Sequence, residues 1–147
     1  MALLDAVLRV NAAQPFEVIC RLERHFPSLS GKRISVLGLA FRPDTDDLRE
    51  SPAIPIVREL ASRGARIRGY DPAAGANART VFGDQLELCE SLEQALLDCD
   101  AAVLVTRWGE FEAVPELIAR LNPGLLLVDG RRMLPKDRIA RYEGIGL

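Results

Sequence analysis

Polar side chains with the chemistry to bind phosphate gather in one loop, residues 38–52, which reads G-L-A-F-R-P-D-T-D-D-L-R-E-S-P. The loop follows a strongly apolar run at residues 34–37 and precedes a helical pattern that starts at Pro52. It holds two arginines, four acids, a threonine and a serine beside one aromatic side chain, Phe41. Connections of this kind usually take about two to six residues, so the loop is longer than a connection requires. Its composition predicts a polar, hydrogen-bonding site.

Further arginines lie in the loops that follow the other predicted strands. In a parallel sheet these loops share the carboxyl edge, where ligands bind. Guanidinium groups bind phosphates in a bidentate manner, and Ser51 with the exposed N–H groups at the start of the following helix adds an anion site. The pattern favours a phosphorylated ligand, whereas the alternative is that the arginines pair with acids on a solvated rim. The arginines are Arg42, Arg49, Arg107, Arg131 and Arg132, and the acids are Asp44, Asp46, Asp47 and Glu50.

A complete dinucleotide site is not predicted in the first loop, because the motif G-x-G-x-x-G is missing. Only Gly38 is present, and the side chains of residues 39–41 would obstruct the close backbone approach that a pyrophosphate needs. Asp71 ends the second predicted strand, where dinucleotide folds often place a ribose-binding acid, although Asp-Pro is also a common turn. The pattern therefore indicates a Rossmann-like domain, but it does not indicate that this domain holds the main NAD site.

Other reaction classes lack the residues that they need. The one histidine, His25, is expected at the end of a helix and away from the loop edge. The sequence has no plausible Ser-His-Asp set, no G-x-S-x-G turn and no P-loop lysine. We expect Asp46 and Asp47 to hold their own loop through hydrogen bonds to its amides rather than to bind a metal. Neither a catalytic residue nor a metal site is predicted in this chain.

The composition is that of an ordinary globular protein of 147 residues, and its formal net charge of −2 provides no basic field for nucleic acid or an anionic membrane. No apolar run approaches the roughly 18 residues of a membrane span, and the start lacks the pattern of a signal peptide. A cytoplasmic protein is therefore expected. Cys20, Cys89 and Cys99 have no C-x-x-C spacing and are expected to be buried structural thiols.

The elements that must position these loops alternate between strand and helix. This alternation, with near-continuous apolar strands, predicts an α/β fold with a Rossmann-like, doubly wound parallel sheet. Strands are predicted at residues 33–37, 65–70, 86–89, 101–106, 125–128 and 142–145, and helices at residues 53–63, 73–81, 91–97 and 110–121, with a short one near Lys136.

An amphipathic helical pattern precedes the first strand. Apolar residues recur at helical spacing over residues 3–26, and Pro15 predicts a kink or a break within this pattern. A leading helix of this kind often packs against a partner subunit or another domain. The predicted division is a helical region at residues 1–27 and a separate domain at residues 28–147.

Five stretches carry a family resemblance: V-N-A-A-Q at residues 10–14, G-K-R-I-S-V-L-G-L-A-F-R-P-D-T-D-D-L-R-E-S-P at 31–52, Y-D-P at 70–72, T-R-W-G-E-F at 106–111 and D-G-R-R at 129–132. In order and spacing they resemble the carboxy-terminal, UDP-binding domain of the UDP-glucose/GDP-mannose dehydrogenase family. The longest stretch is specific, whereas Y-D-P alone would not be. Together the stretches span nearly the whole chain.

The resemblance implies part of an NAD-dependent enzyme that oxidises the 6-hydroxyl of a UDP- or GDP-sugar twice, to a carboxylate. Family members combine an amino-terminal NAD-binding domain, a central helix that forms a homodimer, and a carboxy-terminal domain that closes over the nucleotide sugar. Residues 1–27 would then be the end of the central region. The catalytic cysteine would lie upstream, in a G-G-x-C-x-P-K-D type motif, so this chain would be one excised domain that is inactive alone.

The resemblance also implies roles for single residues. Phe41, Arg42 and Arg131 would bind the nucleotide sugar, and Arg49 would reach across the cleft to NAD held mainly by the other domain. The family usually has lysine in place of Arg42, so a single-point donor becomes a forked one.

The family often has an acid where this chain has Arg107. The neighbouring Trp108 is expected in the core, and the alternative is that it forms a wall on which the nucleotide stacks.

The alternative to the dehydrogenase interpretation is a stand-alone, non-enzymatic module that binds nucleotide or dimerises.

Overall fold

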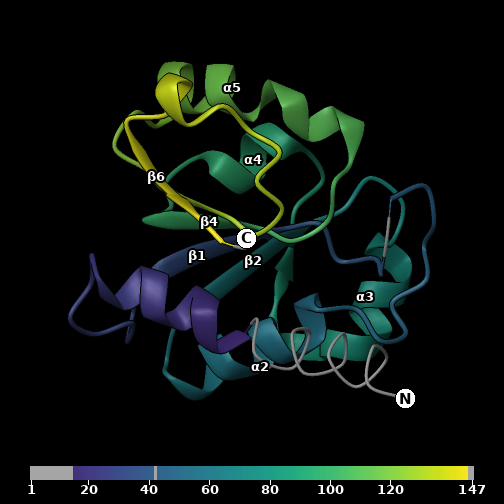
Figure 1. Cartoon of the computed structure of the whole chain (residues 1–147). Coiled ribbons are helices and arrows are strands. Elements are labelled where there is room, and N and C mark those ends of the chain that lie inside the picture. Colours follow the sequence, from purple (N-terminus) through teal and green to yellow (C-terminus); the bar gives the residue numbers. More distant parts are fainter. Residues whose placement is uncertain (1–14, 42, 146–147) are drawn as a thin grey trace, which may run out of the picture.

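A parallel sheet of six strands forms the centre of the computed structural model, which describes residues 15–41 and 43–145 (Figure 1). The spatial order is β3-β2-β1-β4-β5-β6, so the order reverses between β1 and β4, the topological switch point of a doubly wound sheet. The predicted fold class is confirmed. The strands are β1 (Arg33–Leu37), β2 (Arg66–Tyr70), β3 (Glu87–Leu88), β4 (Ala101–Leu104), β5 (Leu126–Asp129) and β6 (Arg141–Gly144).

Helices cover both faces of the sheet (Figure 1). On one face lie the helical residues 15–23, α2 (Ala53–Ser62) and α3 (Gly75–Phe82), and on the other lie α4 (Leu92–Leu96) and α5 (Val114–Leu121). Short 3-10 turns occur at Gly83–Gln85, Gly109–Ala113 and Lys136–Arg138. The helix predicted at residues 110–121 is thus a 3-10 turn followed by α5, and Pro115 lies in the first turn of α5, where proline is tolerated.

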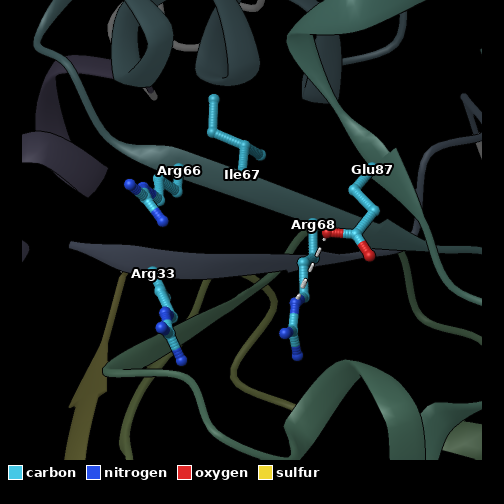
Figure 2. Close-up of a pocket in the computed structure, with 5 residues that line it drawn as sticks. All are labelled: Arg33, Arg66, Ile67, Arg68 and Glu87. Atoms are coloured by element: carbon cyan, nitrogen blue, oxygen red, sulfur yellow. Dashed lines mark ion pairs between the residues drawn. The ribbon is translucent and has the colours of Figure 1, made fainter. Parts of the chain in front are cut away.

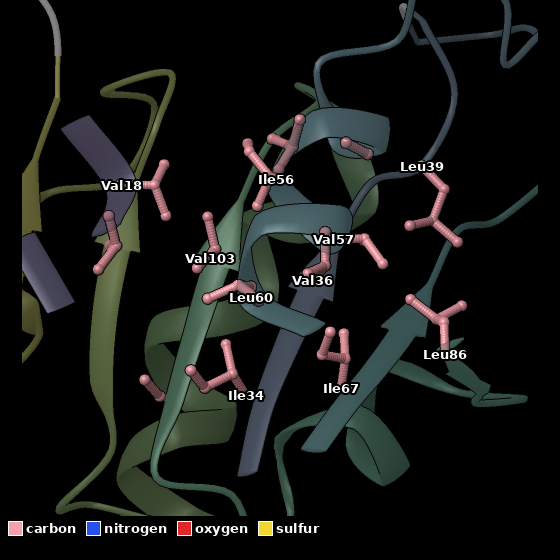
Figure 3. Close-up of a cluster of buried hydrophobic side chains, with 14 of the residues drawn as sticks. Val18, Ile34, Val36, Leu39, Ile56, Val57, Leu60, Ile67, Leu86 and Val103 are labelled. Atoms are coloured by element: carbon pink, nitrogen blue, oxygen red, sulfur yellow. The ribbon is translucent and has the colours of Figure 1, made fainter. Parts of the chain in front are cut away.

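Each face of the sheet has its own apolar core, because successive side chains of a strand point to opposite faces. Figure 3 shows one core, in which Val36 and Val103 of the sheet lie against Ile56 and Leu60 of α2. In the other core, Leu37 and its neighbours in the sheet pack against α4 and α5. The central strands are buried on both sides, which fixes their ends, and hence the loops at the carboxyl edge, in space.

The described part of the leading helix also belongs to the core that Figure 3 shows, on the face of the sheet that α2 covers. Val18, Ile19 and Leu22 are at most 2% exposed and pack with the sheet and α2, whereas Phe16 on the same helix is 63% exposed. Residues 15–23 therefore bury one face against this domain's own sheet. Residues 1–14, with the V-N-A-A-Q stretch and the segment before the kink predicted at Pro15, lie outside the described residues.

The burial expected for the cysteines is confirmed for Cys89 and Cys99 but is wrong for Cys20, which lies on the exposed side of the leading helix. His25 follows this helix, as expected, and its Nε2 lies 3.1 Å from Glu143 Oε1 on β6. Within residues 15–41 and 43–145, no helix has the length and apolar character to cross a membrane.

Candidate functional site

The crevice at the switch point between β1 and β4 is filled by the protein itself. Gly38 follows β1 with a φ of +92°, and a Cβ atom at this position would lie 2.6 Å from the Cβ and 2.7 Å from the backbone nitrogen of Thr106. The Thr106 hydroxyl donates a hydrogen bond to the Ala40 carbonyl at 2.9 Å. Only glycine fits here, and its use brings the two loops into contact instead of opening room for a ligand.

Asp71, at the end of β2, closes the crevice further with both carboxylate oxygens. The side chain is 8% exposed, and it accepts hydrogen bonds from four backbone amides and one indole N–H. Its Oδ2 accepts from Leu39 N at 2.8 Å, Ala40 N at 2.9 Å and Trp108 Nε1 at 3.2 Å, and its Oδ1 accepts from Ala73 N and Ala74 N, each at 2.8 Å. Asp71 thus holds the loops after β1 and β2 and the indole of Trp108 together as a structural anion.

The aromatic residues around the crevice support this closed arrangement. Trp108 is half-buried and packs against both cores, so it has the structural place expected of it. The Tyr70 hydroxyl donates to the Glu110 carboxylate, whose oxygens lie at 2.6 and 2.7 Å. Burial and the Glu110 carboxylate raise the pKa of Tyr70. The first loop and the loop after β4 are thus joined to the end of β2 by buried or half-buried polar contacts.

The outer part of the first loop folds back on itself and presents side chains to solvent. The Phe41 N–H donates to the Asp47 carbonyl at 2.7 Å, and Asp47 Oδ1 accepts the Arg49 N–H at 2.9 Å. The role expected for Asp47, to hold the loop through its amides, is confirmed. Asp46 instead contributes its backbone carbonyl, which accepts from Asn77 Nδ2 at 2.8 Å. The Phe41 side chain stays 40% exposed.

Arg49 extends from this loop, and its guanidinium group is oriented by Asp47. Its Nη2 lies 2.9 Å from Asp47 Oδ2, and its Nε lies 3.1 and 3.2 Å from the two Asp47 oxygens. The hydrogen bond to Asp47 raises the pKa of Arg49, although 89% of the Arg49 side chain is exposed. Phe41, Asp47, Arg49 and Glu50 together line a cavity of about 280 Å³. The loop thus brings two of the predicted site residues, Phe41 and Arg49, to one surface.

Ser51 begins the return from the loop to α2, one residue earlier than a regular N-cap. Its hydroxyl accepts the Ala53 N–H at 3.1 Å and donates to the Leu39 carbonyl at 2.8 Å. The side chain is 2% exposed. Ser51 therefore fastens the loop to the helix start and is not available to an anion.

Arg131 lies in the loop after β5, where its guanidinium is anchored without being neutralised. Its Nε donates to the Val105 carbonyl at 2.8 Å. Burial and the nearby cation of Arg107 lower the pKa of Arg131. Within residues 15–41 and 43–145, no acid forms an ion pair with Arg131, Arg107 or Arg132. The guanidinium groups of two arginines from different loops thus have no ion pair with an acid among these residues, which suits the binding of an anion.

A second strand-end acid, Asp129, holds the turn that carries Arg131. It is fully buried, and its carboxylate accepts from Arg131 N at 3.0 Å, Leu134 N at 2.9 Å and the Tyr142 hydroxyl at 3.0 Å. Burial and this hydrogen bond raise the pKa of Tyr142 to about 12. The backbone of Arg131 is fixed by this network, while its side chain points to the loop after β4.

The predicted site residues are linked by a short chain of contacts. Arg131 bonds to the carbonyl of Val105, the next residue is Thr106, and Thr106 bonds to the carbonyl of Ala40, which precedes Phe41. Arg42, the fourth predicted residue, lies outside the described residues.

Sequence reasoning missed the roles of Asp71 and Asp129. The available signal was an aspartate directly after each apolar strand, a position from which a carboxylate can reach several loop amides.

Comparisons with known proteins agree with this architecture. The model of the UDP-glucose/GDP-mannose dehydrogenase family, UDP binding domain, matches residues 35–136. UDP-glucose 6-dehydrogenase AglM of Haloferax volcanii is 39% identical over 143 residues, covering 97% of this chain and 33% of that protein. The UDP-glucose 6-dehydrogenase of Rhizobium meliloti is 42% identical over 125 residues, covering 80% of this chain and 28% of that protein.

A solved structure of UDP-glucose dehydrogenase from the hyperthermophilic archaeon Pyrobaculum islandicum superposes with a TM-score of 0.85 and 37% identity, over 98% of this chain and 32% of that one. The chain thus spans about a third of the length of these relatives. The family match runs from β1 through the arginine-bearing loop after β5. The chain belongs to the UDP-glucose/GDP-mannose dehydrogenase family and carries its UDP-binding domain.

Proposed function

We propose that this domain forms the nucleotide-sugar wall of the active-site cleft of an NAD-dependent UDP- or GDP-sugar 6-dehydrogenase. The other wall, with the catalytic cysteine and the main NAD site, is supplied by an amino-terminal domain of the same parent chain, and residues 1–27 belong to a central region that forms a homodimer. The observation that carries the proposal is the Arg131 guanidinium, anchored on the Val105 carbonyl beside the cation of Arg107. Neither guanidinium forms an ion pair with an acid in the described residues.

The proposed division of labour follows from the charges and exposure of these residues. Arg131 and Arg107 bind the diphosphate, and exposed Phe41 provides an apolar surface for the nucleotide sugar. Arg42 contributes a forked donor to the same ligand. UDP-glucose is the first substrate to test, because the relatives named above are UDP-glucose dehydrogenases.

NAD is proposed to bind outside this crevice, because Thr106 crowds Gly38 and Asp71 already accepts the Leu39 and Ala40 N–H groups of the first loop. NAD bound by the other domain would accept a hydride in each of the two oxidations. The part of this chain in that chemistry is to hold and orient the nucleotide sugar and to offer Arg49 to the cofactor across the cleft. Arg49 suits this role because Asp47 orients its exposed guanidinium.

Calorimetric titration of the 147-residue chain with UDP and UDP-glucose tests the proposal, with Arg131→Gln and Arg49→Ala as a matched pair. Arg131→Gln removes a charged contact to the diphosphate and should weaken UDP binding at least tenfold, about 1.4 kcal/mol. Arg49→Ala should change it less than twofold, because its proposed partner is NAD. Absence of UDP binding at millimolar concentration, or equal losses in both variants, would contradict the assignment.

A further inference from the structure

Three arginines line a cavity at the amino edge of the sheet, opposite the loops described above (Figure 2). Arg33 begins β1, and Arg66 and Arg68 lie on β2, while Ile67 and Glu87 complete the lining of this cavity of about 220 Å³. The strand β1 has five residues, which span ~16 Å at about 3.3 Å per residue. The arginine cavity (Arg33, Arg66 and Arg68) is therefore distinct from the carboxyl edge.

The register of the sheet places the three cations on one face. Arg33 lies directly opposite Arg66 in the parallel pair of β1 and β2. Arg68 follows two residues later on the same side, whereas Ile67 points to the other side, as Figure 2 shows. Like charges directly opposite each other destabilise a sheet. Without a counter-ion, this arrangement is unfavourable.

Arg68 is held in place by the end of a helix. Its Nη1 donates to the Leu97 carbonyl at 2.8 Å and the Gln94 carbonyl at 3.3 Å, at the carboxyl end of α4. Its Nε lies 3.9 Å from Glu87 Oε2, the ion pair drawn in Figure 2. The carboxylate of Glu87 is thus already paired with Arg68, which also bonds to two carbonyls of α4 and the residue after it.

Arg33 and Arg66 keep most of their donors free. Arg33 Nη1 makes a single long contact to the Asp98 carbonyl at 3.5 Å. Asp100 accepts the backbone N–H of Arg33 at 2.9 Å but forms no ion pair with either guanidinium. In the described part of the chain, the Arg66 side chain has no hydrogen bond or ion pair. The guanidinium groups of Arg33 and Arg66, which both line the cavity, therefore have N–H donors available to a ligand.

We propose that the arginine cavity is a second anion site, which binds a phosphate group, either as inorganic phosphate or on a small phosphorylated molecule. Forked guanidinium donors match the oxygens of a phosphate in a bidentate manner. Pockets for drug-sized ligands start at about 300 Å³, so the size of this cavity suits a small anion rather than a whole nucleotide sugar. A phosphate that bridges Arg33 and Arg66 removes their mutual repulsion and ties the amino ends of β1 and β2 together. The site is independent of the proposed dehydrogenase function, because it lies at the other edge of the sheet.

Phosphate binding by the 147-residue chain tests the proposal, measured by calorimetry at constant ionic strength with chloride as the replaced anion. The probes are inorganic phosphate and glycerol phosphate, and the background variant is Arg131→Gln, which weakens the anion site at the carboxyl edge. We expect saturable binding in that background and at least a tenfold loss of affinity after Arg66→Gln or Arg33→Gln. Binding of both probes identifies the phosphate group itself as the ligand, and binding of inorganic phosphate alone identifies the free ion.

Arg58→Gln is the matched control, because it removes one exposed arginine from α2 and leaves the cavity intact. It should change phosphate affinity less than twofold. Far-UV circular dichroism verifies that each variant is folded. If phosphate binding is absent in the Arg131→Gln background, or if Arg66→Gln and Arg58→Gln have the same effect, the arginine cavity is not an anion site. That result would not contradict the proposed function, which the UDP titration of the Arg131 and Arg49 variants tests separately.

Discussion

Two regions at the carboxyl edge of the sheet each contain a buried aspartate at the end of a strand, but the two aspartates have different effects. We call the region around Asp71 the closed region and the region around Asp129 the open region. Asp71 after β2 accepts hydrogen bonds from Leu39 and Ala40, so the first loop closes the crevice at the switch point. Asp129, the last residue of β5, binds the backbone of Arg131, whose guanidinium donates to the Val105 carbonyl and has no ion pair with an acid among the described residues. A Rossmann-like domain can therefore have a crowded switch point and still present a guanidinium without an ion pair, because a different aspartate holds each region.

The largest effect is expected from Asp71→Asn in the closed region. Asparagine keeps one oxygen acceptor, but its NH₂ group replaces the other oxygen. The backbone N–H groups that donate to that oxygen in the unaltered chain would then face another donor. Charge-assisted bonds contribute roughly 1.5–3 kcal/mol each, so the free energy of unfolding should fall by about 3 kcal/mol or more. Urea unfolding measures the loss.

The control for Asp71→Asn is Arg107→Gln in the loop after β4. The free energy of unfolding of this variant should stay within about 0.5 kcal/mol of that of the unaltered chain. A loss below about 1 kcal/mol for Asp71→Asn, smaller than a single unmade buried hydrogen bond costs, would show that the crevice is closed by other means.

A smaller effect is expected from Gly38→Ala, which tests whether crowding by Thr106 closes the crevice. The control is Gly31→Ala, because Gly31 also has a positive φ, +75°, but nothing within 4 Å of an added Cβ. The left-handed backbone alone costs about 1–2 kcal/mol, and the 2.6 Å contact with Thr106 should raise the loss at Gly38 to about 3 kcal/mol. Equal losses in urea unfolding would mean that backbone conformation, and not crowding, requires glycine there.

The smallest effect concerns Tyr142, which supports Asp129 in the open region. The pKa of Tyr142 is raised to about 12 in the folded chain, above its ordinary value of about 10. Its contribution to stability is therefore complete below pH 10 and is lost as the pH rises from 10 toward 12.

Tyr142→Phe removes this dependence on pH. The difference in unfolding free energy between the two chains should be about 1 kcal/mol at pH 8 and should shrink above pH 10. A difference that stays constant up to pH 11.5 would show that the hydrogen bond from Tyr142 to Asp129 does not contribute to stability.

Much of the fold was predictable because its signals are local. Apolar runs bounded by glycine, proline and aspartate located β1, β2, β4 and β5 to within two residues, and the alternation of elements predicted the parallel sheet. The lower accuracy at the helix predicted at residues 110–121 has a physical cause. Backbone at the start of this segment, Gly109–Ala113, follows a tighter turn that packs Phe111 into the core, and helical periodicity does not record this difference.

The candidate site was less predictable, because residue types alone do not show which partner a polar group takes. Arginines and acids were both evident in residues 38–52, but only the structure shows that Arg49 pairs with Asp47 and that the Arg131 guanidinium has no ion pair among the described residues. The same holds for Asp71, which a pattern search classes with ribose-binding acids until its five donors are known. Cys20 was misjudged for a similar reason, because its exposure depends on which side of the leading helix meets the sheet.

The sequence by itself determined the order of strands and helices, the lack of a glycine-rich dinucleotide motif and the family resemblance of residues 31–52. These are properties of neighbouring residues, and short-range sterics and hydrophobic periodicity are enough to establish them. Only the tertiary structure decided that Thr106 contacts the first loop, that Arg131 bonds to the Val105 carbonyl, and that Arg33 lies opposite Arg66 in the register of β1 and β2. Such contacts join residues far apart in the chain, and strand register and packing, rather than local propensity, bring their side chains together.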